Sequence, residues 1–410
     1  MELLASLFSK ALKLESPWEI TKIEFTEAEG KIKVYIDFPR GSVFQCPKCK
    51  KEAKAYDTTE KQWRHLNFFQ YACYLIVRVP RTDCKEDGKL QIEVPWARDT
   101  GDFTFLFESF AMTLCREMPV NKVSQIIKVD DNKLWRMMTH YTEAARQLAD
   151  YSGVSKIGID ETSKKRGHDY VSLFVDLEGK RTIFVAEGKG SETIGEFRKD
   201  LIGHGGKAEN IMDASIDMSP AFIKGVEENF PQAEITFDKF HIMKIINKAV
   251  DDVRKAEVGA QEILRGQKYL FLKNRERLTK AQEDVLREIE SMPRLNLKTM
   301  RAYHIRENFQ GIYREKTREG FQVALRKWYF WATHSRIEAI KEAAKTLKRH
   351  WKGVLRWYDS KVSNGILEGL NSLVQAAKAK ARGYRTFKNL KTIIYMLTGK
   401  LDYSKVGLPI

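Results

Sequence analysis

The alternation of short strands and helices in residues 154–240 constrains the fold of this chain most strongly. Apolar, β-rich runs predict five strands, at 156–160, 170–177, 181–186, 210–216 and 233–237. The second and third strands form a hairpin around Glu178-Gly179. Helices at 191–202 and 219–230 separate the later strands. The order strand-strand-strand-helix-strand-helix-strand predicts an α/β domain in which helices cover a five-stranded sheet.

The remaining segments predict further domains of different character. Residues 31–38 alternate with period two and residues 71–79 are β-rich, so the first hundred residues are predicted to form short strands. Residues 102–150 have apolar residues at helical spacing, and residues 241–361 are almost wholly helical. A last helix is predicted at 363–381. We therefore expect a multi-domain α+β protein with four parts: 1–100, 101–150, 151–240 joined with 361–402, and 241–360.

The positive net charge of the chain indicates which class of partner it binds. Among 410 residues, 71 are Lys or Arg and 55 are Asp or Glu, which gives a net charge of +16. Such a balance favours polyanionic partners, either nucleic acid or an anionic membrane surface. The longest apolar runs are far shorter than the roughly 20 residues of a membrane span, and the N-terminus lacks a signal-peptide layout. We expect a cytoplasmic protein with no membrane segment.

Acidic residues stand at the ends of three predicted strands. Asp160 ends the first strand, Asp217 follows the fourth and Asp238 follows the fifth. Carboxylates at neighbouring strand ends converge, and two or three of them suit Mg²⁺, which prefers hard oxygen ligands. The alternative is that each is a turn or helix-cap residue, as Asp often is. The strand order and the basic chain favour the metal interpretation for Asp160 and Asp217.

A further acid lies in the last predicted helix. Asn364, Glu368, Asn371 and Gln375 are spaced i, i+4, i+7 and i+11, which places them in one stripe. A glutamate framed by amides is unusual for a solvent-exposed face, although a solvated face is the alternative explanation.

Basic residues are densest around the same helix. Residues 341–388 contain 12 Lys or Arg and 3 Asp or Glu. Tyr384 and Phe387 stand among the cations at the end of this segment. Such a stretch is suited to neutralising phosphates while its aromatic rings stack on unpaired bases. A solvated cationic face is the alternative. It explains the charge but not its concentration beside Glu368.

The five cysteines are few and odd in number, which argues against a disulfide framework and favours metal binding. Cys46 and Cys49 form a CxxC pair, and Cys84 follows with Asp87 where a fourth cysteine would complete a second pair. A carboxylate oxygen can ligate zinc, and His65 or Cys73 are alternative fourth ligands. A zinc site and a degenerate, metal-free ribbon both remain open. Cys115 lies in an apolar helical pattern and is expected in the core.

Two short helices resemble a helix-turn-helix. The first is predicted at Val120–Ile127, and the second, the recognition helix, at Asn132–Tyr141. Lys133, Arg136 and His140 are expected on its outer face, where they would contact DNA.

Several ordered motifs carry a resemblance that covers nearly the whole chain. The motifs are Trp63-Arg-His-Leu-Asn67, Val79-Pro-Arg81, Val94-Pro-Trp-Ala97, Gly158-Ile-Asp-Glu161, Asp217-Met-Ser-Pro-Ala221, Phe237-Asp-Lys-Phe-His241, Asn364-Gly-Ile-Leu-Glu-Gly-Leu-Asn371 and Lys380-Ala-Arg-Gly-Tyr384. With them the sequence resembles the DDE transposases of the ISL-three family of bacterial insertion sequences.

The resemblance implies an RNase H-like catalytic domain with a mixed sheet and a long helical insertion. A zinc-ribbon-like β module and a helix-turn-helix would precede it. It also implies a metal-binding triad of Asp160, Asp217 and Glu368, spaced by 57 and 151 residues. Asp213 is a competing second acid but lies four residues too early. Asp87 departs from the family pattern and leaves metal occupancy of the ribbon in doubt.

The resemblance also guides the expected supporting residues and DNA contacts. Asp238 and His241 match a family motif and are expected beside the triad, holding its carboxylates without binding metal directly. Asn364 and Asn371 are expected in the same supporting role. The predicted DNA contacts are Lys133, Arg136, His140, Lys164, Lys165, Arg166, Lys378, Lys380, Arg382, Arg385 and Lys388.

Two Mg²⁺ ions, for which Mn²⁺ can substitute, suit in-line cleavage and joining of phosphodiesters. The predicted function is therefore a nucleoid-associated DNA transposase. It would bind double-stranded DNA, namely the terminal inverted repeats and the target DNA. On DNA it would act as a homodimer or larger assembly. The alternatives are a catalytically silent, transposase-derived regulator and a related nuclease that cuts without joining.

Overall fold

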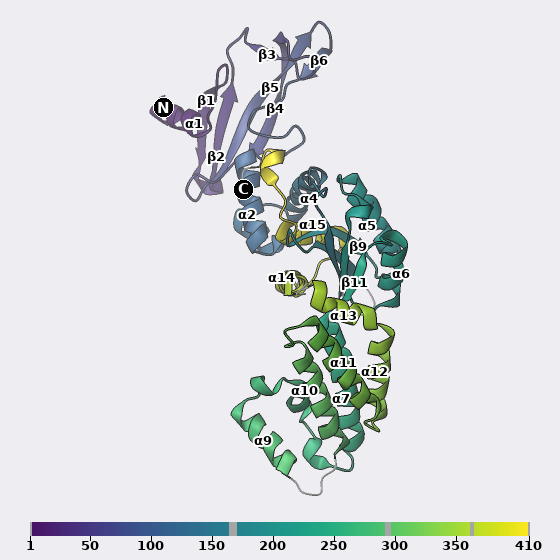
Figure 1. The fold of residues 1–410 in the computed structure, drawn as a ribbon. Coiled ribbons are helices and arrows are strands. Elements are labelled where there is room, and N and C mark those ends of the chain that lie inside the picture. The colour runs from purple at the N-terminus through teal and green to yellow at the C-terminus, as the bar shows by residue number, and fades with distance from the viewer. Residues whose placement is uncertain (1, 164–169, 292–296, 361–364, 409–410) are drawn as a thin grey trace. The chain divides into compact units, whose positions relative to one another are not determined.

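The structure is a computed structural model that describes residues 2–163, 170–291, 297–360 and 365–408. It divides into two compact units. The first contains Met1–Leu148 and Leu401–Ile410, and the second contains Ala149–Lys400 (Figure 1). The sequence placed residues up to 402 with the second unit, whereas the structure places the chain from residue 401 with the first. Within the described residues, no helix has the length and apolarity needed to cross a membrane.

The first unit is built on a sheet whose strands pair in the order β1-β2-β5-β4-β3, with β6 paired to β5. Its elements are α1 (Glu2–Ala11), β1 (Glu19–Thr26), β2 (Lys31–Asp37), β3 (Val43–Gln45), β4 (Glu52–Arg64), β5 (Ala72–Cys84) and β6 (Gly88–Gln91). Ile32, Val34 and Ile36 are buried while their neighbours are not, as the period-two pattern of this segment predicts.

Two of the quoted sequence motifs form the core of this sheet. Trp63 and Trp96 are buried and pack edge to face, with ring centroids 6.2 Å apart. Arg64 is also buried. Its guanidinium lies over the rings of Tyr74 and Phe107 and donates to the carbonyl oxygen of Cys73 at 3.0 Å. These motifs therefore stabilise the module, because they satisfy a buried cation and fill its core.

Three helices complete the first unit: α2 (Phe105–Glu117), α3 (Val120–Ile127) and α4 (Asp131–Gln147). The turn between α3 and α4 begins at Lys128, which has a left-handed φ of 53°, and Asp130 caps α4 by accepting from the amide of Asn132. Glu108 of α2 is fully buried and is satisfied by Arg98 and by the hydroxyl of Tyr141 in α4. This buried network ties α2 to α4.

The second unit is organised around a five-stranded mixed sheet with the order β11-β10-β7-β8-β9. The strands are β7 (Lys156–Ser163), β8 (Tyr170–Asp176), β9 (Arg181–Glu187), β10 (Asp213–Ile216) and β11 (Glu234–Phe237). β7, β10 and β11 are parallel, and β8 is antiparallel to both of its neighbours. β7 continues to Ser163, so Asp160 lies within the strand rather than at its end. Residues 208–210 form a 3-10 turn ahead of β10.

Helices cover both faces of this sheet. The helices are α5 (Glu192–Gly203), α6 (Pro220–Asn229), α14 (Gly365–Lys380) and α15 (Phe387–Thr398). Phe174 of β8 packs on Phe197 of α5, whereas the next residue, Val175, clusters with Leu367 of α14. Successive strand residues point to opposite faces, so α5 and α14 lie on opposite sides of the sheet (Figure 1).

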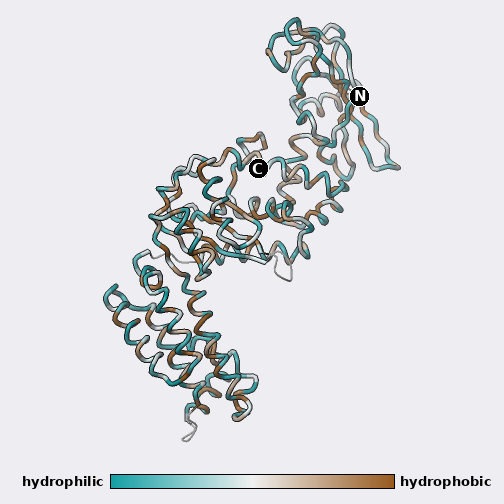
Figure 2. Tube along the Cα trace, turned by 90° about the vertical axis from the view of Figure 1, so that its right-hand side faces the viewer, coloured by the Kyte–Doolittle hydropathy of each residue, from teal (hydrophilic) through white to brown (hydrophobic). Residues whose placement is uncertain are grey.

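A helical segment is inserted between β11 and α14. Its helices are α7 (Lys239–Glu257), α8 (Lys268–Leu272), α9 (Lys280–Ser291), α10 (Lys298–Ile312), α11 (Arg318–Thr333), α12 (Glu338–Arg349) and α13 (Trp351–Ser360). Hydrophobic and hydrophilic residues alternate along these helices (Figure 2). The apolar side chains pack into one core with those of the sheet. The insertion therefore shares one core with the five-stranded sheet and is not a separately packed body.

Candidate active site and zinc centre

The parallel strands place three acids in one row. β10 pairs with β7 so that Ser215 lies beside Gly158, an offset of 57 residues that also relates Asp217 to Asp160. β11 pairs with β10 so that Phe237 lies beside Ile216, an offset of 21 residues that also relates Asp238 to Asp217. Adjacent strands lie about 4.8 Å apart. The register therefore brings the three carboxylates to neighbouring positions at one edge of the sheet.

Helix α14 brings the fourth acid to this edge. Asn371 donates a hydrogen bond from Nδ2 to Asp160 Oδ2, and Gln375 donates to Thr162 Oγ1. Lys378 donates to the carbonyl oxygen of Ser163 at 2.6 Å. These three contacts lay α14 along the end of β7. Glu368 precedes Asn371 by three residues and therefore shares its helix face.

A glycine permits the close approach of this helix to the strand. A Cβ at Gly158 would lie 2.8 Å from Leu367 Cδ1 and 2.8 Å from Leu177 Cδ2. Leu367 of α14 and Leu177 instead pack directly over the bare backbone at that position. The Gly158-Ile-Asp-Glu161 motif thus contains both an acid and the space for the helix that carries Glu368.

The acids and a histidine act on one another electrostatically. Burial raises the pKa of Asp160, and the charge of Asp238 adds to that rise, while His241 and Asn371 oppose it. Burial, Asp238 and Asp160 raise the pKa of Glu368. The hydrogen bond from His241 Nδ1 to Asp238 Oδ2, 3.0 Å long, raises the pKa of His241, and Asp160 and Asp217 add to that effect. The site therefore gathers several carboxylates around one imidazole, whose pKa they raise.

This donor set fits a hard divalent cation. Asp160, Asp217 and Glu368 offer carboxylate oxygens, the ligands that Mg²⁺ prefers, from three separate elements. Burial, and after it the neighbouring carboxylates, raise the pKa values of Asp160 and Glu368, and a bound cation would favour the charged forms of both. Asn371 and the amide of Glu161 each hold one oxygen of Asp160, so its orientation is set by the protein.

Asp213, the competing second acid, has a structural partner. It is buried at the start of β10, where Arg356 Nη2 donates to its Oδ1 at 2.9 Å. Arg356 also pairs with Glu234 at 2.7 Å. The carboxylate of Asp213 therefore ties α13 to the sheet.

Two charged residues to which the sequence analysis gave no role, Glu161 and Lys189, interact electrostatically with this site. Glu161 follows Asp160, and alternation alone would place it on the other face of the strand. Burial raises the pKa of Glu161, Lys189 opposes the rise, and Asp217 and Asp160 add to it. Lys189 lies over the ring of Tyr170, 4.1 Å from its centroid. Glu161 belongs to the quoted Gly158–Glu161 motif, and Lys189 follows the end of β9 by two residues.

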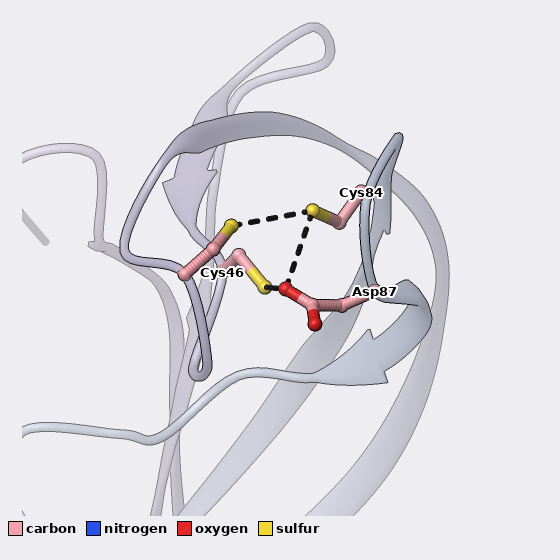
Figure 3. A group of neighbouring side chains, drawn as sticks. Cys46, Cys84 and Asp87 are labelled. Atoms are coloured by element: carbon pink, nitrogen blue, oxygen red, sulfur yellow. Dashed lines mark hydrogen bonds between the residues drawn. The ribbon is translucent and has the colours of Figure 1, made fainter.

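The cysteine-rich ribbon gathers four ligand-type side chains. The ligand atoms of Cys46, Cys49, Cys84 and Asp87 all lie within 4.8 Å of one another. Figure 3 shows the sulfur atoms and the carboxylate converging from two loops. Cys49 Sγ and Cys84 Sγ are 3.5 Å apart, and Asp87 Oδ2 is 3.3 Å from Cys46 Sγ and 3.8 Å from Cys84 Sγ. Tetrahedral zinc with bonds of about 2.3 Å separates its ligands by about 3.7 Å, so this set fits zinc.

The surroundings act in opposite directions on two of the thiols, because burial and the neighbouring Cys84, Asp87 and Cys46 raise the pKa of Cys49. The amides of Asp87 and Glu86 lower the pKa of Cys84. Lys50 adopts a left-handed φ of 58° and donates its amide to the carbonyl oxygen of Cys46 at 3.0 Å, which closes the first loop. The alternative ligands lie elsewhere. His65 bonds Thr104 Oγ1 at 2.9 Å, and Cys73 is buried in the sheet core. Cys115 is buried in α2, as expected.

The expected DNA contacts separate into groups. On α4, Arg136 and His140 are exposed, and the side chain of Lys133, which is 43% exposed, pairs with Asp102 at 2.9 Å. Lys378 is partly buried and donates to the carbonyl oxygen of Ser163 at the end of β7. Lys380, Arg382, Arg385 and Lys388 are exposed around the turn between α14 and α15. Asn364, Lys164, Lys165 and Arg166 lie outside the described residues.

Known protein families match each part of this architecture. A transposase model of the ISL3 family matches residues 157–394. A model described as the zinc-finger of transposase IS204/IS1001/IS1096/IS1165 matches residues 42–87, and one described as the helix-turn-helix domain of transposase family ISL3 matches residues 92–142. The chain thus combines a zinc ribbon, a helix-turn-helix and a DDE transposase domain, and multi-domain α+β is its fold class.

Two transposases are similar to this chain over almost its whole length. The transposase for insertion sequence element IS1557 of Mycobacterium tuberculosis is 27% identical over 416 residues, covering 93% of this chain and 92% of the relative. The transposase for insertion sequence element IS1001 of Bordetella parapertussis is 25% identical over 377 residues, covering 89% and 91%. Together with the family match over more than half of the sequence, the sheet order and the zinc ribbon, this places the chain in the ISL3 transposase family.

Proposed function

We propose that this chain cuts and joins DNA at the ends of an insertion sequence through Asp160, Asp217 and Glu368. The observation that carries the proposal is the strand register, which aligns Asp160, Asp217 and Asp238 in one row, with α14 held against that row through Asn371. Three carboxylates from separate elements suit two divalent cations better than a structural role, since structural acids in this unit, such as Asp213, have basic partners.

The three carboxylates would hold two Mg²⁺ ions, for which Mn²⁺ can substitute. When bound, these ions would supply Lewis acidity to the attacking and leaving oxygens of a phosphodiester. Asn371 orients Asp160, and Asp238 orients the ring of His241. These supporting side chains keep the acids in place without needing to touch the ions. No side-chain nucleophile is required, since water and then the freed 3′-hydroxyl attack phosphorus in line.

The remaining parts of the chain would bind and position DNA. Arg136 and His140 on α4 would contact the inverted repeats, and Lys380, Arg382, Arg385 and Lys388 would neutralise phosphates near the acids. Cys46, Cys49, Cys84 and Asp87 would hold a structural zinc ion. Two copies of the chain, or more, would bridge two DNA ends. The domain limits proposed for these roles are those expected from the sequence, except that residues 401 and 402 belong to the first unit.

A cleavage assay tests the proposal. Purified full-length protein would be mixed with labelled DNA carrying the element's ends, in Mg²⁺ or Mn²⁺, beside Glu368→Gln. We expect metal-dependent nicking at the end boundary, absent in the variant, with end binding retained. Specific binding without cleavage in either metal would instead support the silent regulator. Cleavage without joining to a target duplex would support the nuclease.

A further inference from the structure

Helix α11 carries a row of exposed side chains that the proposed chemistry does not use. The row, named here the α11 face, consists of Val323, Arg326, Lys327, Phe330, Trp331 and His334, all exposed. Their spacing follows one side of a helix, and the opposite side buries Phe321, Leu325, Trp328 and Ala332 against the neighbouring helices. Phe330 is 64% exposed and Trp331 is 42% exposed. These two rings therefore contribute little to the hydrophobic core.

One of the rings is held in place although it faces solvent. Phe330 stacks on the imidazole of His334, with centroids 4.0 Å apart and an interplanar angle of 28°. His334 is fixed in turn, because its Nδ1 bonds the carbonyl oxygen of Phe330 at 2.7 Å. A ring held this way is a preorganised stacking platform and loses little entropy when a planar group binds.

The charges on this face all have one sign. Residues 320–337 contain no Asp or Glu. Cations flanking the segment are paired, since Arg318 bonds Asp359 at 2.8 Å and Lys341 lies 3.3 Å from Glu338. Arg326 and Lys327, by contrast, have no ion-pair partner within the described part of the chain. The face thus presents aromatic rings next to uncompensated positive charge.

We infer that the α11 face binds an unpaired DNA strand, whose bases stack on Phe330 and Trp331 while its phosphates contact Arg326 and Lys327. A duplex exposes base edges and phosphates but not the faces of its bases, so stacking requires unpaired nucleotides. A second copy of this chain fits less well, because a symmetric contact would set these cations against their own copies. The inference rests on the proposed function, which brings DNA ends to this unit.

Binding measured without catalysis tests this inference. Full-length, zinc-loaded protein in a buffer without Mg²⁺ or Mn²⁺ would be titrated, by fluorescence anisotropy, with a single-stranded oligonucleotide of end sequence and with its duplex. Phe330→Ala/Trp331→Ala should weaken single-strand binding roughly tenfold or more and leave duplex binding unchanged. Tyr269→Ala is the control, because Tyr269 is also 64% exposed in the insertion but lies on α8. It should bind both DNAs as the parent protein does.

The salt dependence separates the phosphate contacts from the stacking. Arg326→Gln/Lys327→Gln should flatten the slope of log affinity against log salt by about 0.7 for each cation on the single strand. The aromatic variant should keep that slope.

Three results would overturn the inference. The first is unchanged single-strand binding by Phe330→Ala/Trp331→Ala, and the second is an equal loss of single-strand binding by Tyr269→Ala. The third is a change in the sedimentation coefficient of Phe330→Ala/Trp331→Ala without a change in its DNA affinity. The last would identify the face as a contact between copies. Because the proposed cleavage needs Mg²⁺ or Mn²⁺, leaving out both ions removes cleavage from the measurement, and failure here leaves the proposed function standing. Conversely, loss of the proposed cleavage would leave a positive binding result intact.

Discussion

Two candidate metal sites are assembled in opposite ways. One is the zinc-type cluster of Cys46, Cys49, Cys84 and Asp87, and the other is the carboxylate edge of Asp160, Asp217 and Glu368. The cluster draws its four ligands from two short loops, and their ligand atoms all lie within 4.8 Å of one another. The edge draws Asp160 and Asp217 from neighbouring strands and Glu368 from a helix 151 residues further along the chain. Among the described residues, its acids do not form a comparably tight group. The cluster is thus closed by local turns, and the edge by long-range packing.

The difference predicts how each site responds to damage. A locally built site depends on its own ligands, so ligand substitutions should change metal retention and the ribbon alone. A site built by packing depends equally on the contacts that place its elements, so substitutions away from the acids should also impair it. The following predictions test this distinction, from the largest expected effect to the smallest.

The largest effect is expected at Asp160. Asp160→Asn keeps the shape of the side chain but removes a charge and a ligand from the edge, so the single-turnover rate of end cleavage should fall by about a thousandfold or more. Binding to end DNA should stay within about twofold. The matched control is Asp213→Asn, which should lower the free energy of unfolding by about 1–3 kcal/mol through Arg356 yet retain cleavage. Unimpaired cleavage by Asp160→Asn would refute the assigned role.

The next effect concerns the fourth ligand of the cluster. Asp87→Ala should weaken zinc binding roughly a hundredfold, since four ligands share about 10–16 kcal/mol, as measured by competition with a chromogenic chelator. Asp87→Cys should retain zinc at least as well as the parent. Neither change should alter unfolding of the second unit. Equal zinc affinity in all three proteins would show that Asp87 is not a ligand.

A smaller effect should come from a glycine that binds nothing. Gly158→Ala places a methyl group against Leu367 and should cost about 1–3 kcal/mol of stability. It should also slow cleavage, because α14 carries Glu368. Gly369→Ala is the control within α14 itself, since a Cβ there meets nothing within 4 Å. It should stabilise the protein by about 0.5–1 kcal/mol. Normal cleavage by a destabilised Gly158→Ala protein would show that the packing at Gly158 stabilises the unit without positioning Glu368.

The smallest effect is a pH dependence confined to the first unit. Burial, assisted by Arg64, lowers the pKa of His65 to about 4. The unfolded chain therefore binds a proton below about pH 6.5 while the folded chain does not, so stability falls as pH decreases through that range. The loss should be about 1.4 kcal/mol per pH unit at most. Thermal unfolding of His65→Gln should show a flatter profile between pH 6.5 and 5.5, and an identical profile would refute the assignment.

Much of the architecture was predictable from local patterns. The period-two alternation around Ile32 and Val34 marked a half-buried strand, and the helical spacing of residues 120–127 matched α3 at both ends. Boundaries failed where no local signal existed. β7 runs past Asp160 to Ser163 because pairing with β8 continues to Tyr170, and that partner cannot be read from the strand itself.

The side-chain partners of the candidate residues were less predictable. Lys133 had the helical position of an outward DNA contact, yet Asp102, outside its own helix, pairs with it. The sequence set Asp213 aside because it lies four residues too early, but its ion pair with Arg356 of α13 could not be read from the sequence. Such partners are remote in sequence, so composition and spacing carry no information about them.

By itself, the sequence determined the ligand types, the order of strands and helices, and the family motifs, because these depend on residue identity and short-range periodicity. Only the tertiary structure decided that offsets of 57 and 21 residues align three acids in one row. It alone also decided that α14 lies against Gly158, and that Phe330 and Trp331 remain outside the core. Strand register and helix docking come from packing over the whole unit, and that free energy is shared among residues far apart in the chain.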